Sequence, residues 1–239
     1  GTTKEVTSAG ATVVASPVDG AKFLGFVDGD GAILSESTSY TVVPSGNMNV
    51  KAIFVGANSA PHFSVGGISQ KETEGLFGIG SEKYNVIGKT HIFDNLNDAA
   101  SYANSSASAK GIMVMNDGVL PAGDYTIPQG VYLLIPFWDD ETQSDNIMYT
   151  DNVLARTYKD EGSYKESFIA PTTYRKLTLA SGAHITVNGA LNLSAKQIVV
   201  NGGKVSGGSP VDSVSMMVMN DGSSITVNNG GKLYAYGFI

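Results

Sequence analysis

The side chains best suited to binding a ligand are concentrated between positions 137 and 174. This segment holds the single tryptophan of the chain, several tyrosines, a group of acids and Arg156, with Arg175 directly after it. Flat rings with polar edges suit contact with sugar rings, and neighbouring charged groups can hydrogen-bond hydroxyls. We therefore predict a ligand-binding surface formed by Trp138, Asp139, Asp140, Tyr149, Arg156, Tyr158 and Tyr164. The competing interpretation is that these rings pack their own segment against the fold.

Residues for catalysis are sparse. The histidines, His62, His91 and His184, lie far apart in the sequence, and no G-x-S-x-G motif positions a serine nucleophile. Asp117 and Asp221 occur in a repeated turn-like hexapeptide, and a turn motif seldom supplies a catalytic carboxylate pair. The chain has no cysteine, which excludes disulfides, thiolate metal sites and a cysteine nucleophile. We predict no catalytic residue, no metal site and no cofactor.

Composition limits the partners and the fold class. A net charge of -7, a pI near 4.9 and few arginines exclude nucleic acid, because phosphate binding needs clustered Lys and Arg. No apolar run approaches the roughly 18 residues that span a bilayer, so we expect no membrane insertion. We also expect a monomer. Charged residues make up only 15% and glycines number 29, which indicates β-structure with tight turns.

The C-terminal third has a regular rhythm. Gly182, Gly202 and Gly222 recur every 20 residues, each after a residue that favours turns. Apolar residues recur in the same register, which predicts stacked coils with Ile185, Val205 and Ile225 in one buried column. The same register places His184 in a solvated outward column beside Lys204 and Ser224. The hexapeptide MVMNDG, at 113–118 and again at 217–222, is interpreted as the outer bend of a coil.

This periodic sequence pattern resembles the right-handed parallel β-helix of pectin-lyase-like proteins over residues 111–239. The resemblance implies a β-solenoid, against the alternative of an antiparallel sandwich. Polysaccharide lyases of that fold typically use calcium-binding carboxylates with a basic residue, and no such grouping can be matched here. Before the first coil, Leu96, Ala99, Ala100 and Ala103 fall on one helical face after an Asn/Asp-rich start. We interpret this helix as an N-terminal cap plugged by Phe93 and Leu96, with an ordinary surface helix as the alternative.

The N-terminal stretch alternates short strands with the turn signals PVDG, DGDG and PSGN. Its V-x-A-S-P start, G-x-x-F-x-G-F core, aromatic-x-V strand and final VKAIF resemble an internalin B-type repeat over residues 6–55, with Phe26 where the family usually has tryptophan. The resemblance implies a small β-module from a secreted or wall-attached protein of Gram-positive bacteria. DGDG at 28–31 could start a calcium loop, but the later ligand positions hold Ala32 and Ser39, which favours a hairpin turn.

These observations predict an all-β chain with a repeat module at 1–56, a linker and packing segment at 57–90, and a β-helix domain at 91–239 with an excursion at 137–174. The closing phrase GGKLYAYGFI indicates a fragment of a longer protein. We expect a non-catalytic display scaffold, extracellular or cell-wall associated, whose partner is a host or dietary glycan or a surface protein. The alternative is a carbohydrate-active β-helix enzyme, either a polysaccharide lyase or a glycoside hydrolase. Three or more carboxylates on stacked coils would favour the enzyme, and a smooth Asn/Thr-lined surface would favour the scaffold.

Overall fold

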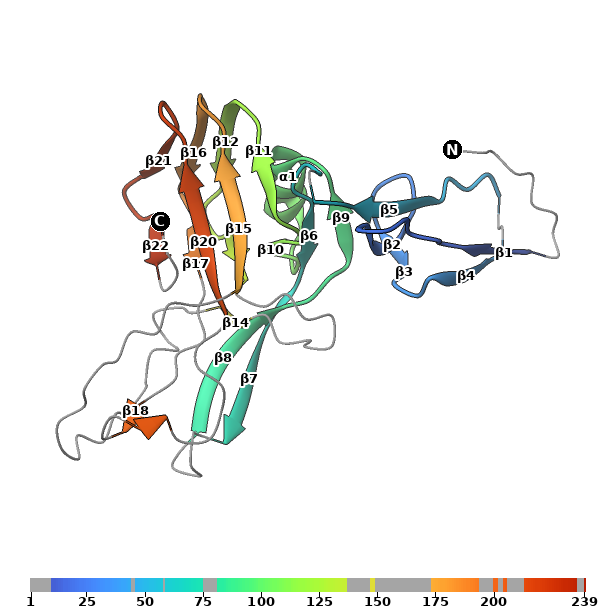
Figure 1. Cartoon of the computed structure of the whole chain (residues 1–239), viewed down its shortest axis with the longest axis horizontal. Helices are drawn as coiled ribbons and strands as arrows, with labels where there is room; N and C mark the ends of the chain where they lie inside the picture. Colours follow the sequence, from blue (N-terminus) through green and yellow to red (C-terminus); the bar gives the residue numbers. More distant parts are fainter. Residues whose placement is uncertain are drawn as a thin grey trace.

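The computed structural model describes residues 10–43, 46–57, 59–74, 81–136, 147–148, 173–193, 200–201, 204–205, 213–235 and 239. Its regular structure is mostly β-strand, with parallel sheets and a single described helix, α1 (Leu96–Ser105). The predicted all-β class is therefore confirmed. Figure 1 shows the sheets gathered on one side, the N-terminal strands on the other, and a hairpin below them.

Three sheets form the body of the fold. The largest has the order β22-β17-β13-β10-β6-β9, and two three-stranded sheets have the orders β11-β15-β20 and β12-β16-β21. In the largest sheet the strands are β6 (Phe63–Gly66), β9 (His91–Phe93), β10 (Gly111–Val114), β13 (Tyr132–Ile135), β17 (Ala190–Leu193) and β22 (Lys232–Ala235). The other two contain β11 (Gly118–Leu120), β15 (Thr173–Leu179), β20 (Ser213–Met219), β12 (Gly123–Ile127), β16 (Ala183–Val187) and β21 (Ser224–Val227).

The chain visits these sheets in one repeating order. It runs through β10, β11 and β12, then through β13, β15 and β16, then through β17, β20 and β21, and returns to the first sheet at β22. Within each sheet the strands from successive passages pair in parallel. Residues of equivalent position therefore line up in rows across neighbouring strands.

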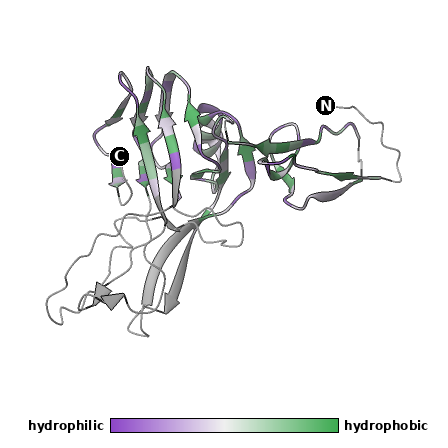
Figure 2. Cartoon of the chain, viewed as in Figure 1, coloured by the Kyte–Doolittle hydropathy of each residue, from purple (hydrophilic) through white to green (hydrophobic). Residues whose placement is uncertain are grey.

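The core lies between the three sheets, because alternate side chains of each strand point inward. Ile185 and Val187 of β16 are fully buried, whereas His184, directly before Ile185, is exposed. The main core cluster draws on all three sheets and on α1. This alternation gives each strand one apolar face, and Figure 2 shows hydrophobic and hydrophilic residues interleaved along the strands.

The 20-residue register was wrong. Ile185 pairs directly with Ile225, 40 residues later, while Val205 pairs with Val200 in a separate antiparallel ribbon of β18 (Val200–Asn201) and β19 (Lys204–Val205). Lys204 accordingly does not stand beside His184. A sequence pattern of short strands and turns is the same in a sheet and in an insertion. Spacing alone therefore could not show that the chain leaves the three sheets between β17 and β20.

The two copies of MVMNDG occupy different bends. The first connects β10 to β11, and the second connects β20 to β21. Met113 packs in a side cluster with Ile87 and Leu134, whereas Met217, its counterpart, lies in the main core. A shift of one residue reverses the face that a strand presents, so the same six residues serve opposite surroundings. The prediction of a bend holds for both copies, but they are not equivalent positions of one repeat.

Helix α1 matches its prediction. Asn95 caps its N-terminus by accepting from the amides of Asn97 and Asp98, and Leu96, Ala99, Ala100 and Ala103 are all buried. The helix contacts β6, β9, β10 and β12, and its apolar face joins the main core with Phe93 partly buried against it. It thus covers the core beside the first passage of the chain.

The N-terminal module comprises β1 (Ala11–Val14), β2 (Lys22–Val27), β3 (Ile33–Ser35), β4 (Ser39–Val42) and β5 (Lys51–Val55). Phe26 is only 3% exposed and contacts the rings of Phe23 and Tyr40, so the predicted core aromatic is in place. DGDG forms the predicted turn between antiparallel β2 and β3. There the Asp28 carboxylate accepts from the amides of Asp30 and Ala32, and Gly31 adopts a φ of +88°.

Residues 57–90 contribute more than a linker. Strand β6 from this segment is fully part of the largest sheet, pairing with β9 and β10. It is followed by β7 (Ile68–Glu74) and β8 (Ser81–Ile87), which form the hairpin that extends below the sheets in Figure 1, with β14 (Ile147–Met148) paired to β8. The apolar residues Phe77 and Ile79, from which the sequence predicts that this segment packs, lie outside the described residues. The sheet therefore begins before the domain boundary predicted at residue 91.

Candidate functional site

The predicted aromatic surface belongs to a segment outside the described residues. Trp138, Asp139, Asp140, Tyr149, Arg156, Tyr158 and Tyr164 all lie outside the described residues. At the end of that segment, Tyr174 and Arg175 belong to β15, where they pair with Val214 and Ser215 of β20. The described part of the chain instead presents two other candidate surfaces.

The first candidate surface is the outer side of the β12-β16-β21 sheet, called the polar face here. Strand pairing aligns its side chains in two rows, Asp124–His184–Ser224 and Thr126–Thr186–Thr226. Neighbouring strands lie about 4.8 Å apart, so each row is a closely spaced series of polar groups. Asp124, His184, Thr126 and Thr226 are exposed, and Ser224 and Thr186 are half-buried.

Hydrogen bonds order the polar face at its edge and its centre. His184 Nδ1 lies 2.8 Å from Ser224 Oγ. At the β12 edge, the Asn97 side chain of α1 donates to the Asp124 carbonyl over 2.9 Å and accepts from the Thr126 amide. Because an open strand edge exposes unpaired main-chain groups, this asparagine protects β12 from pairing with another chain.

The Asp124–His184–Ser224 row combines the residue types of a serine hydrolase triad. A nucleophilic mechanism needs a serine bonded to a base and the base oriented by an acid. The His184–Ser224 bond supplies the first contact, but among the described residues no hydrogen bond joins Asp124 to His184. The row is also open to solvent, so water would screen the charge that forms in a reaction. The arrangement is better suited to hydrogen-bonding a ligand than to acyl transfer.

The carboxylates singled out in MVMNDG have structural surroundings. Asp117 accepts a hydrogen bond from the Lys176 amide over 2.9 Å, which ties the first bend to β15 of the next passage. Asp221 lies in an exposed turn before β21. Across the part of the chain that the structure describes, no three His, Asp or Glu side chains are grouped so as to hold a metal ion.

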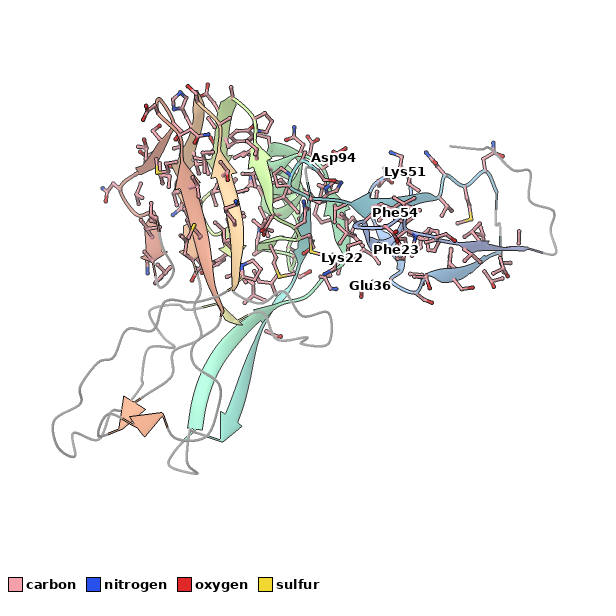
Figure 3. All side chains as sticks on the ribbon, viewed as in Figure 1. Lys22, Phe23, Glu36, Lys51, Phe54 and Asp94 are labelled. Carbon is pink, nitrogen blue, oxygen red and sulfur yellow. The ribbon has the colours of Figure 1, made fainter. Side chains whose placement is uncertain are left out.

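The second candidate surface is an aromatic pair on the N-terminal module. Phe23 and Phe54 face each other across β2 and β5, with ring centroids 5.4 Å apart, and Phe54 is 38% exposed. Figure 3 shows both side chains on the module, with Lys51 on the same strand as Phe54 and Lys22 next to Phe23. An exposed ring can stack on a sugar ring or another flat apolar group. Sequence reasoning missed this pair because KAIFV reads as an ordinary half-buried strand.

One tyrosine beneath the polar face is shielded from solvent. Tyr125 points into the core and donates its hydroxyl to the Pro121 carbonyl over 2.9 Å. Burial raises the pKa of Tyr125 above its usual value near 10, since the phenolate would lose hydration. It therefore stays neutral and acts as a packing residue that supports β12.

Comparisons with family models, curated proteins and solved structures returned no match. Among the described residues there is no helix with the length and apolarity needed to cross a membrane. Evidence on function therefore comes from the chain itself.

Proposed function

We propose that this chain is a non-catalytic fragment of a secreted or cell-surface protein of a Gram-positive-type bacterium. In this proposal a right-handed parallel β-helix forms a stiff scaffold, and the N-terminal module and the outer faces display contacts for a glycan or a surface protein. The observation that carries the proposal is the repeated passage of the chain through the same three sheets in parallel register. Such stacking is typical of solenoids, whose outer faces are extended and available for binding.

The polar face supports a scaffold role. Its rows are built mainly from threonine, serine and histidine, with Asp124 as the one carboxylate among the six described side chains. A hydrogen bond from Asn228 Nδ2 to Asn188 Oδ1, 2.8 Å long, continues this polar surface into the following bend. These groups can hydrogen-bond sugar hydroxyls without providing the clustered carboxylates of a calcium-dependent lyase.

The N-terminal module supports a surface location. Phe26 is buried at the position where internalin B-type repeats usually carry tryptophan. The exposed Phe54 ring offers the flat apolar contact that the polar face lacks. We therefore assign the first glycan contact to Phe54, with the segment around Trp138 as a further contributor.

Binding to a panel of plant, mucin and cell-wall polysaccharides tests the proposal. Phe54→Ala should weaken the affinity for a bound glycan roughly tenfold, which corresponds to about 1.4 kcal/mol. Val14→Ala is a matched control. Val14 is also exposed on the module, but it belongs to β1 and not to the strands that carry the aromatic pair. Absence of binding by the unmodified chain, or equal binding by both variants, would contradict this assignment.

A carbohydrate-active enzyme is the second candidate, and the Asp124–His184–Ser224 row favours a hydrolase that cleaves ester groups on a carbohydrate. A serine-directed phosphonate probe separates the two functions, because an activated Ser224 Oγ displaces fluoride from phosphorus while His184 Nδ1 accepts its proton. Labelling of Ser224 that His184→Asn abolishes would support the enzyme and overturn the non-catalytic proposal. We expect no labelling above that of Ser224→Ala.

A further inference from the structure

The N-terminal module is joined to the largest sheet through the segment that follows DGDG. The Ile92 amide donates to the Gly31 carbonyl over 2.8 Å, and Ala32 and His91 form an antiparallel bridge. The segment 31–33 therefore covers the outer edge of β9, which would otherwise expose unpaired main-chain groups. Figure 1 shows β9 between the sheets and the module.

An apolar layer strengthens this junction. Leu24, Val27 and Val55 of the module form one buried cluster with Ile92 of β9. Because packed side chains leave little room for movement, the shared cluster holds the DGDG turn in a fixed position beside β9. Side chains of the turn and of β9 can therefore act on one ligand.

Three rings from β9 and α1 form an aromatic group at this junction, called the junction cluster here. The His91 ring centroid lies 4.1 Å from that of Tyr102 and 6.1 Å from that of Phe93, and the Phe93 and Tyr102 centroids are 5.5 Å apart. A Cβ at Gly31 would lie 3.7 Å from Phe93 Cε1, so the junction cluster borders the DGDG turn. All three residues are only half-buried, whereas Phe26 in the aromatic core of the module is covered. The junction cluster therefore keeps aromatic surface that a ligand can reach.

The hydrogen bonds around His91 determine which of its ring nitrogens can accept from a ligand. Thr90 Oγ1 donates to the Val65 carbonyl over 2.9 Å and lies 3.0 Å from His91 Nδ1. Because the hydroxyl proton is already used, Oγ1 accepts from Nδ1–H, and Nε2 of the neutral ring is an acceptor. Burial lowers the pKa of His91 below its ordinary value of 6.5 and outweighs the opposite effect of Asp28 and Asp30, so the ring is uncharged at neutral pH.

Other polar groups beside the junction cluster are also available to a ligand. The carboxylates of Asp28 and Asp30 lie near enough to act on the charge of His91. Asp28 uses Oδ1 to accept from the amides of Asp30 and Ala32. Within the described residues, no hydrogen bond engages Asp28 Oδ2, the Asp30 carboxylate, the Tyr102 hydroxyl or His91 Nε2. Aromatic surface and unengaged acceptors thus occur side by side.

We propose that the junction cluster and the DGDG turn form a subsite for one ring of a neutral sugar. In this subsite the aromatic surface covers the apolar side of the sugar, and sugar hydroxyls donate to His91 Nε2 and to the carboxylates of Asp28 and Asp30. Because these carboxylates repel anions, sugars that carry carboxylate or sulfate groups are rejected. The inference rests on the proposed glycan-binding function and adds to it a subsite and a class of sugar.

Titration of the whole chain with short oligosaccharides tests the subsite. The neutral probes are cellohexaose, xylohexaose and chitohexaose, and the anionic probe is an oligogalacturonate of the same length. We expect at least one neutral probe to bind and to shift the NMR signals of the His91 imidazole and the Tyr102 ring. Oligogalacturonate should shift neither set of signals.

Two variants and a matched control locate the binding. Tyr102→Leu keeps an apolar side chain but removes the ring, and it should weaken the affinity for the bound neutral probe roughly tenfold. Asp30→Ala should weaken it by roughly threefold, because a hydrogen-bond acceptor is lost, and since Asp30 is exposed the core stays undisturbed. Asp19→Ala is the control, because Asp19 is also an exposed acid directly before a glycine with positive φ in a turn of the module. It should leave the affinity unchanged.

The outcomes distinguish the subsite from the proposed function. If a neutral probe binds and Phe54→Ala weakens its binding while Tyr102→Leu and Asp30→Ala do not, the subsite is refuted but glycan binding stands. If no oligosaccharide or polysaccharide binds the whole chain, both are refuted. Oligogalacturonate that binds and shifts the His91 signals would overturn the assignment to neutral sugars.

Discussion

At the residue scale, neighbouring side chains of one strand have opposite environments. Ile185 is fully buried in the main core, while Thr186 beside it belongs to the outer polar face. Ile185→Ala should lower the free energy of unfolding by about 2–5 kcal/mol, because it removes buried methyl groups and leaves a cavity. Thr186→Ala should change it by less than about 0.5 kcal/mol. Denaturant unfolding measures both, and equal losses would contradict the inward orientation of Ile185.

A glycine in the largest sheet provides a second prediction at this scale. A Cβ at Gly66 would lie 1.8 Å from the Gly88 carbonyl oxygen, too close for any side chain, where the hairpin of β7 and β8 leaves and rejoins the sheets. Gly66→Ala should therefore lower the thermal midpoint by several degrees, as a loss of about 1 kcal/mol or more does in a chain of this size. Gly67→Ala is the matched control, because Gly67 does not have a positive φ and a Cβ there would lie 3.6 Å from its nearest neighbour. Gly130→Ala would not serve, because the φ of Gly130 is +76° and a side chain there would be strained. Equal midpoints for the two variants would refute the close approach at Gly66.

At the element scale, the parts predicted correctly are those with a local signal. Leu96, Ala99, Ala100 and Ala103 share one helical face, Phe26 lies in a short apolar strand, and DGDG is a strong turn signal between two strands. The parts missed depend on distance along the chain. Asp124 and His184 are paired across 60 residues, and no periodicity tells how many of those belong to an insertion. The packing of Ile92 against the N-terminal module also has no signal in the sequence around Ile92.

That shared cluster changes the expectation for the module. The sequence boundary predicts that the remaining chain folds when residues 1–56 are removed. The structure adds that removal exposes Ile92 and uncovers the β9 edge that segment 31–33 protects. A chain that begins at residue 57 should therefore melt at a lower temperature and aggregate more readily than the whole chain. Light scattering with a thermal melt checks this, and an unchanged melting temperature would show that the junction contributes no stability.

At the scale of the whole molecule, the proposed scaffold leaves ligand binding to exposed side chains outside the core. Trp138 remains the main candidate from the sequence, and as the single tryptophan it reports on its own surroundings by fluorescence. We predict that a bound polysaccharide shifts its emission and that Trp138→Ala weakens binding by roughly tenfold. Emission that no polysaccharide shifts, together with unaltered binding by the variant, would make the segment around Trp138 a packing element.

Successive passages of the chain stack in the register Thr126–Thr186–Thr226. Because the chain has no cysteine, engineered pairs can be linked without interference. Thr186 and Thr226 are direct partners in adjacent parallel strands, close enough for a disulfide or a very short cross-linker. We predict rapid cross-linking of Thr186→Cys/Thr226→Cys under mild oxidation, as measured by peptide mass spectrometry. Faster linkage of Thr186→Cys/Ser206→Cys, the pair that the 20-residue period predicts, would contradict the stacking described here.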